Sequence, residues 1–109
     1  MDLTVTFRHF EGSDNLRDYV EKSLGKLERF CDSVEDAHVI LGIEKHRNLV
    51  EITVNVHGQV LKAMNEANDM YISIDGAVDK LERQLKKYNT KLKSHRRGRK
   101  TSESPVGEE

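Results

Sequence analysis

A row of basic residues in the C-terminal third is the feature of this sequence best suited to bind a ligand. Four cations, separated by three, four and four residues, would form one row on a helix and are called the basic stripe: Lys80, Arg83, Lys87 and Lys91. No carboxylate occurs between Glu82 and Glu103, and nine of those twenty residues are Lys or Arg. A solvated helix face normally mixes both signs of charge. The stripe therefore predicts a polyanionic partner, and nucleic acid in particular.

The formal net charge of −1 hides a strong separation of charge along the chain. Residues 1–74 carry a net charge of −5, whereas residues 75–100 carry +7. Such an asymmetry indicates a partner rather than a fold. A weaker basic row occurs earlier, where Lys22, Lys26 and Arg29 are separated by four and three residues.

Other kinds of site find little support in the residue spacing. The five histidines form no HxxxH or HxH pair and Cys31 is the only cysteine, so neither a metal nor a cofactor is expected. The sequence has no glycine-rich phosphate loop and no nucleophile elbow, and we predict neither an enzyme nor a small-molecule substrate. Zinc-finger spacing, RNP-type aromatic strands and a GxxG loop are also absent, which favours recognition of RNA by shape and backbone.

Length and composition predict one small domain. The 109 residues suffice for a single modest core, and no apolar run approaches the roughly 20 residues that cross a bilayer. The N-terminus lacks the basic and apolar regions of a secretory signal. A single cysteine excludes an intramolecular disulfide, so we expect a reducing, cytoplasmic location. Without a long apolar run, we expect no membrane partner.

Hydrophobic periodicity predicts a strand and a helix at the N-terminus. Leu3, Val5 and Phe7 alternate with threonines, as in a half-buried strand. Ser13 or Asp14 can cap a helix of four to five turns that extends to about residue 31. The helix is predicted from apolar residues at three- and four-residue steps: Leu16, Tyr19, Val20, Leu24, Leu27, Phe30 and Cys31. Gly25 either weakens this helix or marks close packing against a sheet.

The remaining pattern predicts three strands and a long helix. Alternating apolar residues occur over 37–43 and 50–56, and a shorter strand over 59–66 follows a tight turn at His57–Gly58. Asn68 or Asp69 can cap a helix starting at Met70, in which Gly76 permits a strand to approach closely. Its apolar face is formed by Ile74, Val78, Leu81, Leu85, Tyr88 and Leu92.

The predicted fold class is α+β, with the order β-α-β-β-β-α. A four-stranded sheet with both helices packed on one face is the natural way to bury two amphipathic helices. We place the domain at residues 1–95. Residues 96–109 lack apolar periodicity and contain the only proline, so a disordered C-terminal tail is predicted there.

The segment NDMYISIDGAVDKLERQLKKYNTKLK resembles the signature of the bacterial ribosome hibernation promoting factors and ribosome-associated translation inhibitors. In that family "DMY", "ID" and "DKLxRQLxK" recur in this order and spacing. The segments LRDYVEKSLGKLERF and VILGIEK are also similar to the family. The resemblance covers residues 1 to about 95. It implies the same β-α-β-β-β-α fold, which is similar to a double-stranded RNA-binding domain.

The resemblance also implies a function. Family members bind the small ribosomal subunit in the channel for messenger RNA and the A- and P-site transfer RNAs, and they reversibly inhibit translation in stationary phase or stress. Basic residues of both helices contact the rRNA in that family. Carried over by position, they are Lys22, Lys26, Arg29, Lys80, Arg83, Lys86, Lys87 and Lys91.

Two departures limit what the resemblance implies about ribosome pairing. Long members carry a second, dimerising domain that this sequence lacks, and the acidic end of the tail is shorter than in some short members. We favour the short hibernation-promoting type, which pairs ribosomes with a separate ribosome modulation factor. Two other functions stay open, a protein-interaction module that modulates an alternative sigma factor and a generic double-stranded RNA-binding domain.

Overall fold

The strands and helices follow one another in the order that the sequence predicts, with a 3₁₀ turn added after the first helix. The structure, a computed structural model, describes residues 2–29 and 34–97, with the side chains of residues 88–97 left out. The elements are β1 (Asp2–Arg8), α1 (Asp14–Gly25), the 3₁₀ turn η1 (Lys26–Arg29), β2 (Val34–Glu44), β3 (Arg47–Val56), β4 (Gln59–Ala67) and α2 (Met70–Arg97). The predicted α+β class and the order β-α-β-β-β-α are confirmed.

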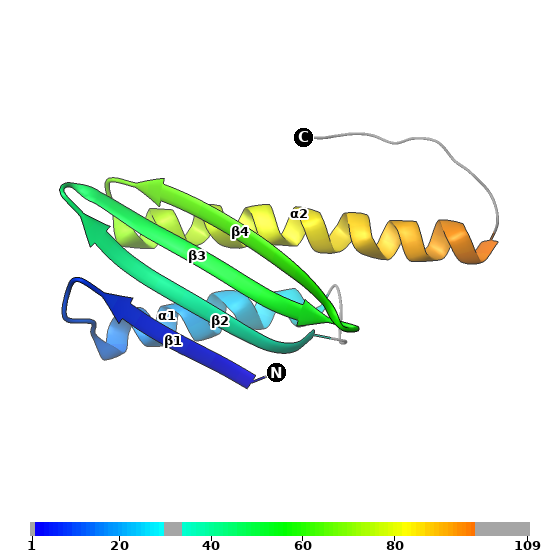
Figure 1. Ribbon diagram of the computed structural model, residues 1–109, viewed down its shortest axis with the longest axis horizontal. Helices are drawn as coiled ribbons and strands as arrows, with labels where there is room; N and C mark the ends of the chain where they lie inside the picture. The colour runs from blue at the N-terminus through cyan, green and yellow to red at the C-terminus, as the bar shows by residue number, and fades with distance from the viewer. Residues whose placement is uncertain (1, 30–33, 98–109) are drawn as a thin grey trace.

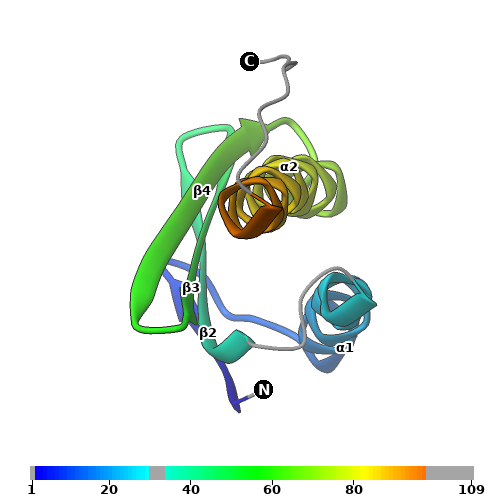
Figure 2. The same cartoon turned by 90° about the vertical axis from the view of Figure 1, so that its right-hand side faces the viewer.

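The four strands form one sheet in the order β1-β2-β3-β4, with both helices on the same face (Figures 1 and 2). β1 pairs parallel with β2 through the α1 crossover, whereas β2, β3 and β4 form an antiparallel meander. His57 and Gly58 have φ angles of 53° and 77°, which the two-residue hairpin turn between β3 and β4 requires. The second hairpin turn, between β2 and β3, contains only Lys45 and His46.

The core lies between the sheet and the helices. Alternate residues of β2 and β3 point towards the helices because side chains along a strand alternate between its two faces. Those buried on the two strands are Val34, Ala37, Val39, Leu41, Val50, Ile52, Val54 and Val56. Leu3, Val5 and Phe7 of β1 are partly buried against this core, as expected for a half-buried strand at the edge of the sheet.

The first helix is shorter than the sequence predicts. The Ser13 hydroxyl accepts a hydrogen bond from the amide of Leu16 (3.2 Å), which confirms the predicted cap. The helix ends at Gly25, and the chain continues as η1, where Leu27 is still fully buried. The apolar spacing thus persists after the α-helical hydrogen bonding has stopped. A Cβ at Gly25 would meet no atom within 4 Å, so close packing does not explain this glycine. Residues 30–33 lie outside the described part.

The second helix begins as predicted. The Asp69 carboxylate accepts from the amide of Ile72 (3.1 Å) and caps α2 at Met70. Of the predicted apolar face, Ile74, Val78, Leu81 and Leu85 are buried, and the side chains of Tyr88 and Leu92 are outside the described residues. α2 continues to Arg97, two residues beyond the predicted domain boundary, and extends past the sheet (Figure 1). Residues 98–109, which cover most of the predicted tail, also lie outside the description.

Candidate nucleic-acid interface

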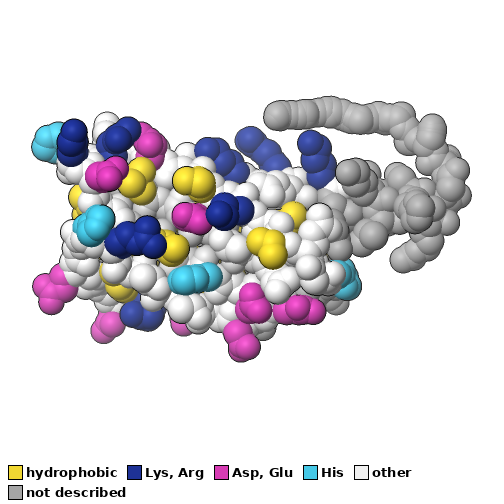
Figure 3. Space-filling view, in the orientation of Figure 1, with side chains coloured by type: hydrophobic (Ala, Val, Ile, Leu, Met, Phe, Trp, Pro, Cys, Tyr) yellow, Lys and Arg dark blue, Asp and Glu magenta, His cyan; other side chains and the backbone are white. Residues whose placement is uncertain are grey.

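The described part of the basic stripe follows the flank of α2 beside β4. The Lys80 ammonium donates to the carbonyl oxygen of Met64 (2.8 Å), and the Gln84 amide, one turn later, donates to that of Lys62 (2.8 Å). Both contacts place this flank against the free edge of β4. In the space-filling view, Lys and Arg side chains accordingly gather along the upper margin, over α2 (Figure 3).

The cations of α2 differ in whether they already form an ion pair within the protein. Arg83 and Lys87 are exposed, and within the described residues neither forms an ion pair. Lys86 pairs with Glu82 one turn earlier (3.3 Å). This pair forms because Glu82, the last carboxylate before the basic run, lies within reach of Lys86. The side chain of Lys91 is outside the described residues.

The basic row predicted on the first helix is divided between two elements. Lys22 lies on α1, whereas Lys26 and Arg29 lie on η1, and all three are exposed. The prediction of one continuous α-helical row is wrong, because the α-helix ends at Gly25. In a 3₁₀ turn three residues complete one turn, so Lys26 and Arg29 point in nearly the same direction.

The cations of α2 are spread around its exposed surface. Asp75 of α2 contacts Tyr19 of α1, so this flank of α2 faces α1. Lys80 follows five residues later, which turns it roughly 140° away from Asp75 at 100° per residue. The same arithmetic puts Arg83 roughly 80° and Lys86 only roughly 20° from Asp75, so Lys86 lies on the flank that faces α1 and the eight predicted residues do not form one narrow row. Figure 2 shows α1 and α2 as separate rods on the sheet.

A contact that the sequence does not reveal joins the two helices. The Tyr19 hydroxyl donates to the Asp75 carboxylate at 2.6 Å, and the Tyr19 ring meets the edge of the Tyr71 ring with 4.9 Å between centroids. The hydrogen bond to Asp75, followed by desolvation, raises the pKa of Tyr19 above its usual value of 10.0. Tyr19 and Asp75 are 56 residues apart, and no local periodicity relates them.

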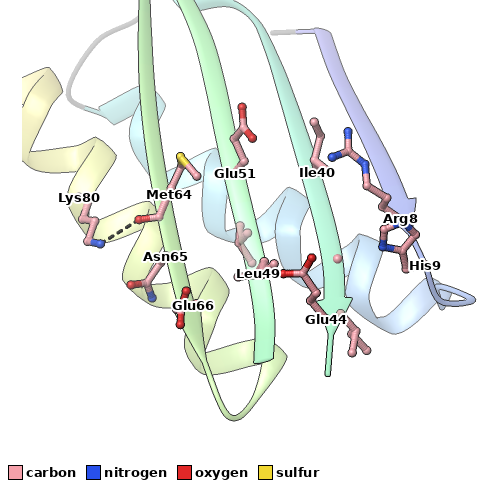
Figure 4. A pocket seen from close by; sticks show the side chains of 13 residues that line it. Arg8, His9, Ile40, Glu44, Leu49, Glu51, Met64, Asn65, Glu66 and Lys80 are labelled. Carbon is pink, nitrogen blue, oxygen red and sulfur yellow. Dashed lines mark hydrogen bonds between the residues drawn. The ribbon is translucent and has the colours of Figure 1, made fainter. Parts of the chain in front are cut away.

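The outer face of the sheet has a different character from α2. It carries a shallow hollow of about 450 Å³ that Ile40, Gly42, Leu49 and Met64 help to line (Figure 4). The charges around it are largely paired: Glu51 lies 3.2 Å from Lys62, and Arg47 lies 3.2 Å from Glu66. Paired charges leave few cations for phosphate groups, so this face is not the candidate interface.

Neither a metal site nor a membrane span is found in the described part of the chain. Its His, Cys, Asp and Glu residues form no group of three or more that could hold a metal ion. Cys31 is outside this search. None of the described helices combines the length and hydrophobicity that crossing a membrane requires.

Comparisons with known proteins supply independent information. Residues 3–93 match the family model described as "Sigma 54 modulation protein / S30EA ribosomal protein". The ribosome hibernation promoting factor of Escherichia coli strain K12 is 39% identical over 95 residues, which are 87% of this chain and 100% of the relative. The protein of the same name from Azotobacter vinelandii is 37% identical over 106 residues, covering 97% and 99% of the two chains.

Solved structures agree with the described fold. A ribosomal subunit interface protein from Coxiella burnetii superposes with a TM-score of 0.79 at 32% identity, covering 83% of this chain and 99% of the other. The N-terminal domain of Protein Y from Thermus thermophilus gives a TM-score of 0.74 at 37% identity, covering 81% and 99%. The match to the Deinococcus radiodurans ribosome hibernation promotion factor, 40% identical, spans only 51% of that longer protein.

Proposed function

Because the chain belongs to the Sigma 54 modulation protein / S30EA ribosomal protein family, we propose that it is a ribosome hibernation factor that binds rRNA of the small subunit and reversibly inhibits translation. Relatives named as ribosome hibernation promoting factors are covered over nearly their whole length, which supports this proposal. The family consists of binding proteins, and the chain is not an enzyme. A ribosomal partner places the protein in the cytoplasm.

The observation that carries the proposal is the exposed cation row on the β4 flank of α2. Arg83 and Lys87 present charges without a protein partner in the described residues, and each can displace counterions from a phosphate. Lys80 and Lys86 already have partners, so they contribute to RNA binding only by sharing or exchanging them. The proposed rRNA-binding residues remain Lys22, Lys26, Arg29, Lys80, Arg83, Lys86, Lys87 and Lys91.

The cations are spread around the exposed surface of α2, from the flank that faces α1 to the flank beside β4, which supports binding within a channel. A protein that lies on one flat RNA surface needs cations on one side only. A protein enclosed by rRNA in the channel for messenger RNA and transfer RNAs meets phosphates on several sides. Pairing of ribosomes with a separate ribosome modulation factor belongs to the same proposal.

The test is a double charge reversal on α2, Arg83→Glu with Lys87→Glu. We choose these positions because both side chains are exposed and neither supports the β4 edge, unlike Lys80. Removal of two phosphate contacts should flatten the slope of log affinity against log salt by about 1.4–1.8, at 0.7–0.9 per contact. Affinity is measured on purified small subunits, and inhibition in a cell-free translation assay.

The matched control makes the same change in net charge on the other side of the molecule. Arg8→Glu with Lys45→Glu alters two exposed cations of β1 and the β2–β3 turn, and should leave the salt slope unchanged. If the α2 variant binds and inhibits like wild type, the basic stripe is a solvated face and the assignment of the site is wrong. Wild-type protein that binds duplex RNA as tightly as small subunits would instead indicate a generic RNA-binding domain.

A further inference from the structure

The contact between Tyr19 and Asp75 is placed where it can set the position of α1 relative to α2. The two helices run in the same direction across one face of the sheet (Figure 1). α1 contains only 12 residues and rests on the core through Val20 and Leu24. Such apolar contacts are not directional and permit a short helix to shift or rotate. The hydrogen bond of 2.6 Å from Tyr19 to Asp75 is directional and charge-assisted, and it fixes one orientation.

The cations of α1 and η1 lie close along the chain to this contact. Lys22 follows Tyr19 by three residues, a distance of about 4.5 Å along the helix axis. Lys26 begins η1 one turn later. Any rotation of α1 that breaks the contact therefore moves these side chains relative to α2. The T-shaped packing of Tyr19 on Tyr71 holds the ring, and the hydroxyl supplies the directional part.

The charge of Asp75 makes its location informative. A carboxylate between two basic surfaces repels phosphate and by its charge alone weakens RNA binding. Asp75 is exposed, so burial does not explain its presence. Its observed role is to accept the hydrogen bond that the Tyr19 hydroxyl donates.

We propose that Tyr19 and Asp75 are positioning residues that hold the cations of α1 and η1 in register with the basic stripe of α2 for simultaneous contact with rRNA. This inference rests on the proposed function. Neither residue touches the RNA in this arrangement. They act by reducing the freedom of α1 before binding, so that less ordering is needed when the two surfaces engage phosphates together.

Substitutions at Asp75 separate positioning from electrostatics because the two effects have opposite signs. Asp75→Ala removes a negative charge, which by charge alone strengthens RNA binding, but it also removes the acceptor for Tyr19. We expect affinity for small subunits to fall roughly three- to tenfold, less than the full loss of a charge-assisted hydrogen bond would produce, because this bond orders α1 before binding and does not itself contact RNA. Asp75→Asn removes the charge and keeps an amide oxygen as acceptor, so it should bind at least as tightly as wild type.

Two further variants complete the design. Asp79→Ala removes an exposed carboxylate one turn further along α2 that accepts no hydrogen bond from α1, so it should strengthen binding. Tyr19→Phe keeps the ring on Tyr71 and deletes only the hydroxyl, so it should weaken binding like Asp75→Ala without any change of charge. The effect of Tyr19→Phe should be smaller in a Lys22→Gln background but unchanged beside Lys87→Gln, because only α1 is displaced.

Thermal unfolding of each variant, recorded at the same salt, confirms that binding is measured on folded protein. The positioning role is refuted if Asp75→Ala binds more tightly than wild type, as Asp79→Ala should, or if Tyr19→Phe equals wild type. Both results presuppose that wild-type protein binds small subunits. If wild type does not bind them, the proposed function is wrong and the positioning role is wrong with it.

Discussion

Gly76 offers a test in which helix propensity and packing predict opposite results. In an exposed helix interior, replacing glycine by alanine gains about 0.8–1 kcal/mol. At Gly76, however, an added Cβ would overlap the side-chain amide nitrogen of Asn65 on β4, and the Asn65 Cγ would be only 2.8 Å away. Asn65 cannot simply turn aside, because its amide donates to the carbonyl oxygen of Ser73 (3.2 Å). The methyl group added by Gly76→Ala would therefore clash with an Asn65 side chain that a hydrogen bond keeps in place.

The magnitude follows from three contributions. Overpacking at a close contact costs about 1–3 kcal/mol, and loss of the Asn65 hydrogen bond adds about 0.5–1.5 kcal/mol. The helix propensity of alanine offsets about 1 kcal/mol of this. We expect Gly76→Ala to lower the free energy of unfolding by about 0.5–3.5 kcal/mol, measured by urea denaturation. Gly25→Ala is the matched control: its Cβ enters open space, so it should raise the free energy of unfolding by about 0.4–1 kcal/mol.

A second substitution locates the cause. Asn65→Ala removes the side chain that the new methyl group would strike, so adding Gly76→Ala to it should cost less than Gly76→Ala does in the wild type. If Gly76→Ala stabilises the protein as Gly25→Ala does, α2 and β4 do not approach as closely as described and the reasoning is wrong.

Two further predictions concern the core and the pH dependence of stability. Leu85→Ala, at a fully buried position, should lower the free energy of unfolding by about 2–5 kcal/mol, as measured by thermal unfolding. Lys87→Ala, two residues later, should change this free energy little. An unchanged midpoint for Leu85→Ala would show that this face is not the core. The hydrogen bond to Asp75 raises the pKa of Tyr19, so folding favours the protonated hydroxyl. The resulting stabilisation is fully present below pH 10.0 and declines as pH rises through the folded pKa, a decline that should be shallower in Tyr19→Phe. If wild type and Tyr19→Phe lose stability equally between pH 8 and 11, this prediction is wrong.

Much of the fold could be predicted because local patterns determine it. Alternation located β2, β3 and β4, and polar residues at Ser13 and Asp69 marked the first turns of both helices. The interpretation of Gly76 as a site that a strand approaches closely is confirmed by Asn65 of β4. The end of α1 was missed because Leu27 remains buried in η1, and burial rather than hydrogen bonding produces the apolar spacing. The parallel pairing of β1 with β2 is long-range and leaves no local signal.

The candidate site was predictable in composition but not in arrangement. The spacing of Lys80, Arg83 and Lys87 indicates a shared helix flank, and the structure places the described flank beside β4. The sequence could not show that Lys80 donates a hydrogen bond to the carbonyl oxygen of Met64, because that contact depends on how α2 crosses the sheet. For the same reason it could not show how these cations lie relative to Lys22.

The contacts of Lys80 and Gln84 with β4 bear on how this strand avoids pairing with a second chain. An exposed strand edge offers unpaired carbonyl and amide groups on which a second chain can add a strand. On β4, two outward carbonyls are occupied by side chains from α2, one helical turn apart. Truncating Lys80 therefore opens a template for aggregation as well as removing a cation. A Lys80 variant that fails to inhibit translation has to be checked for self-association before the failure is attributed to RNA.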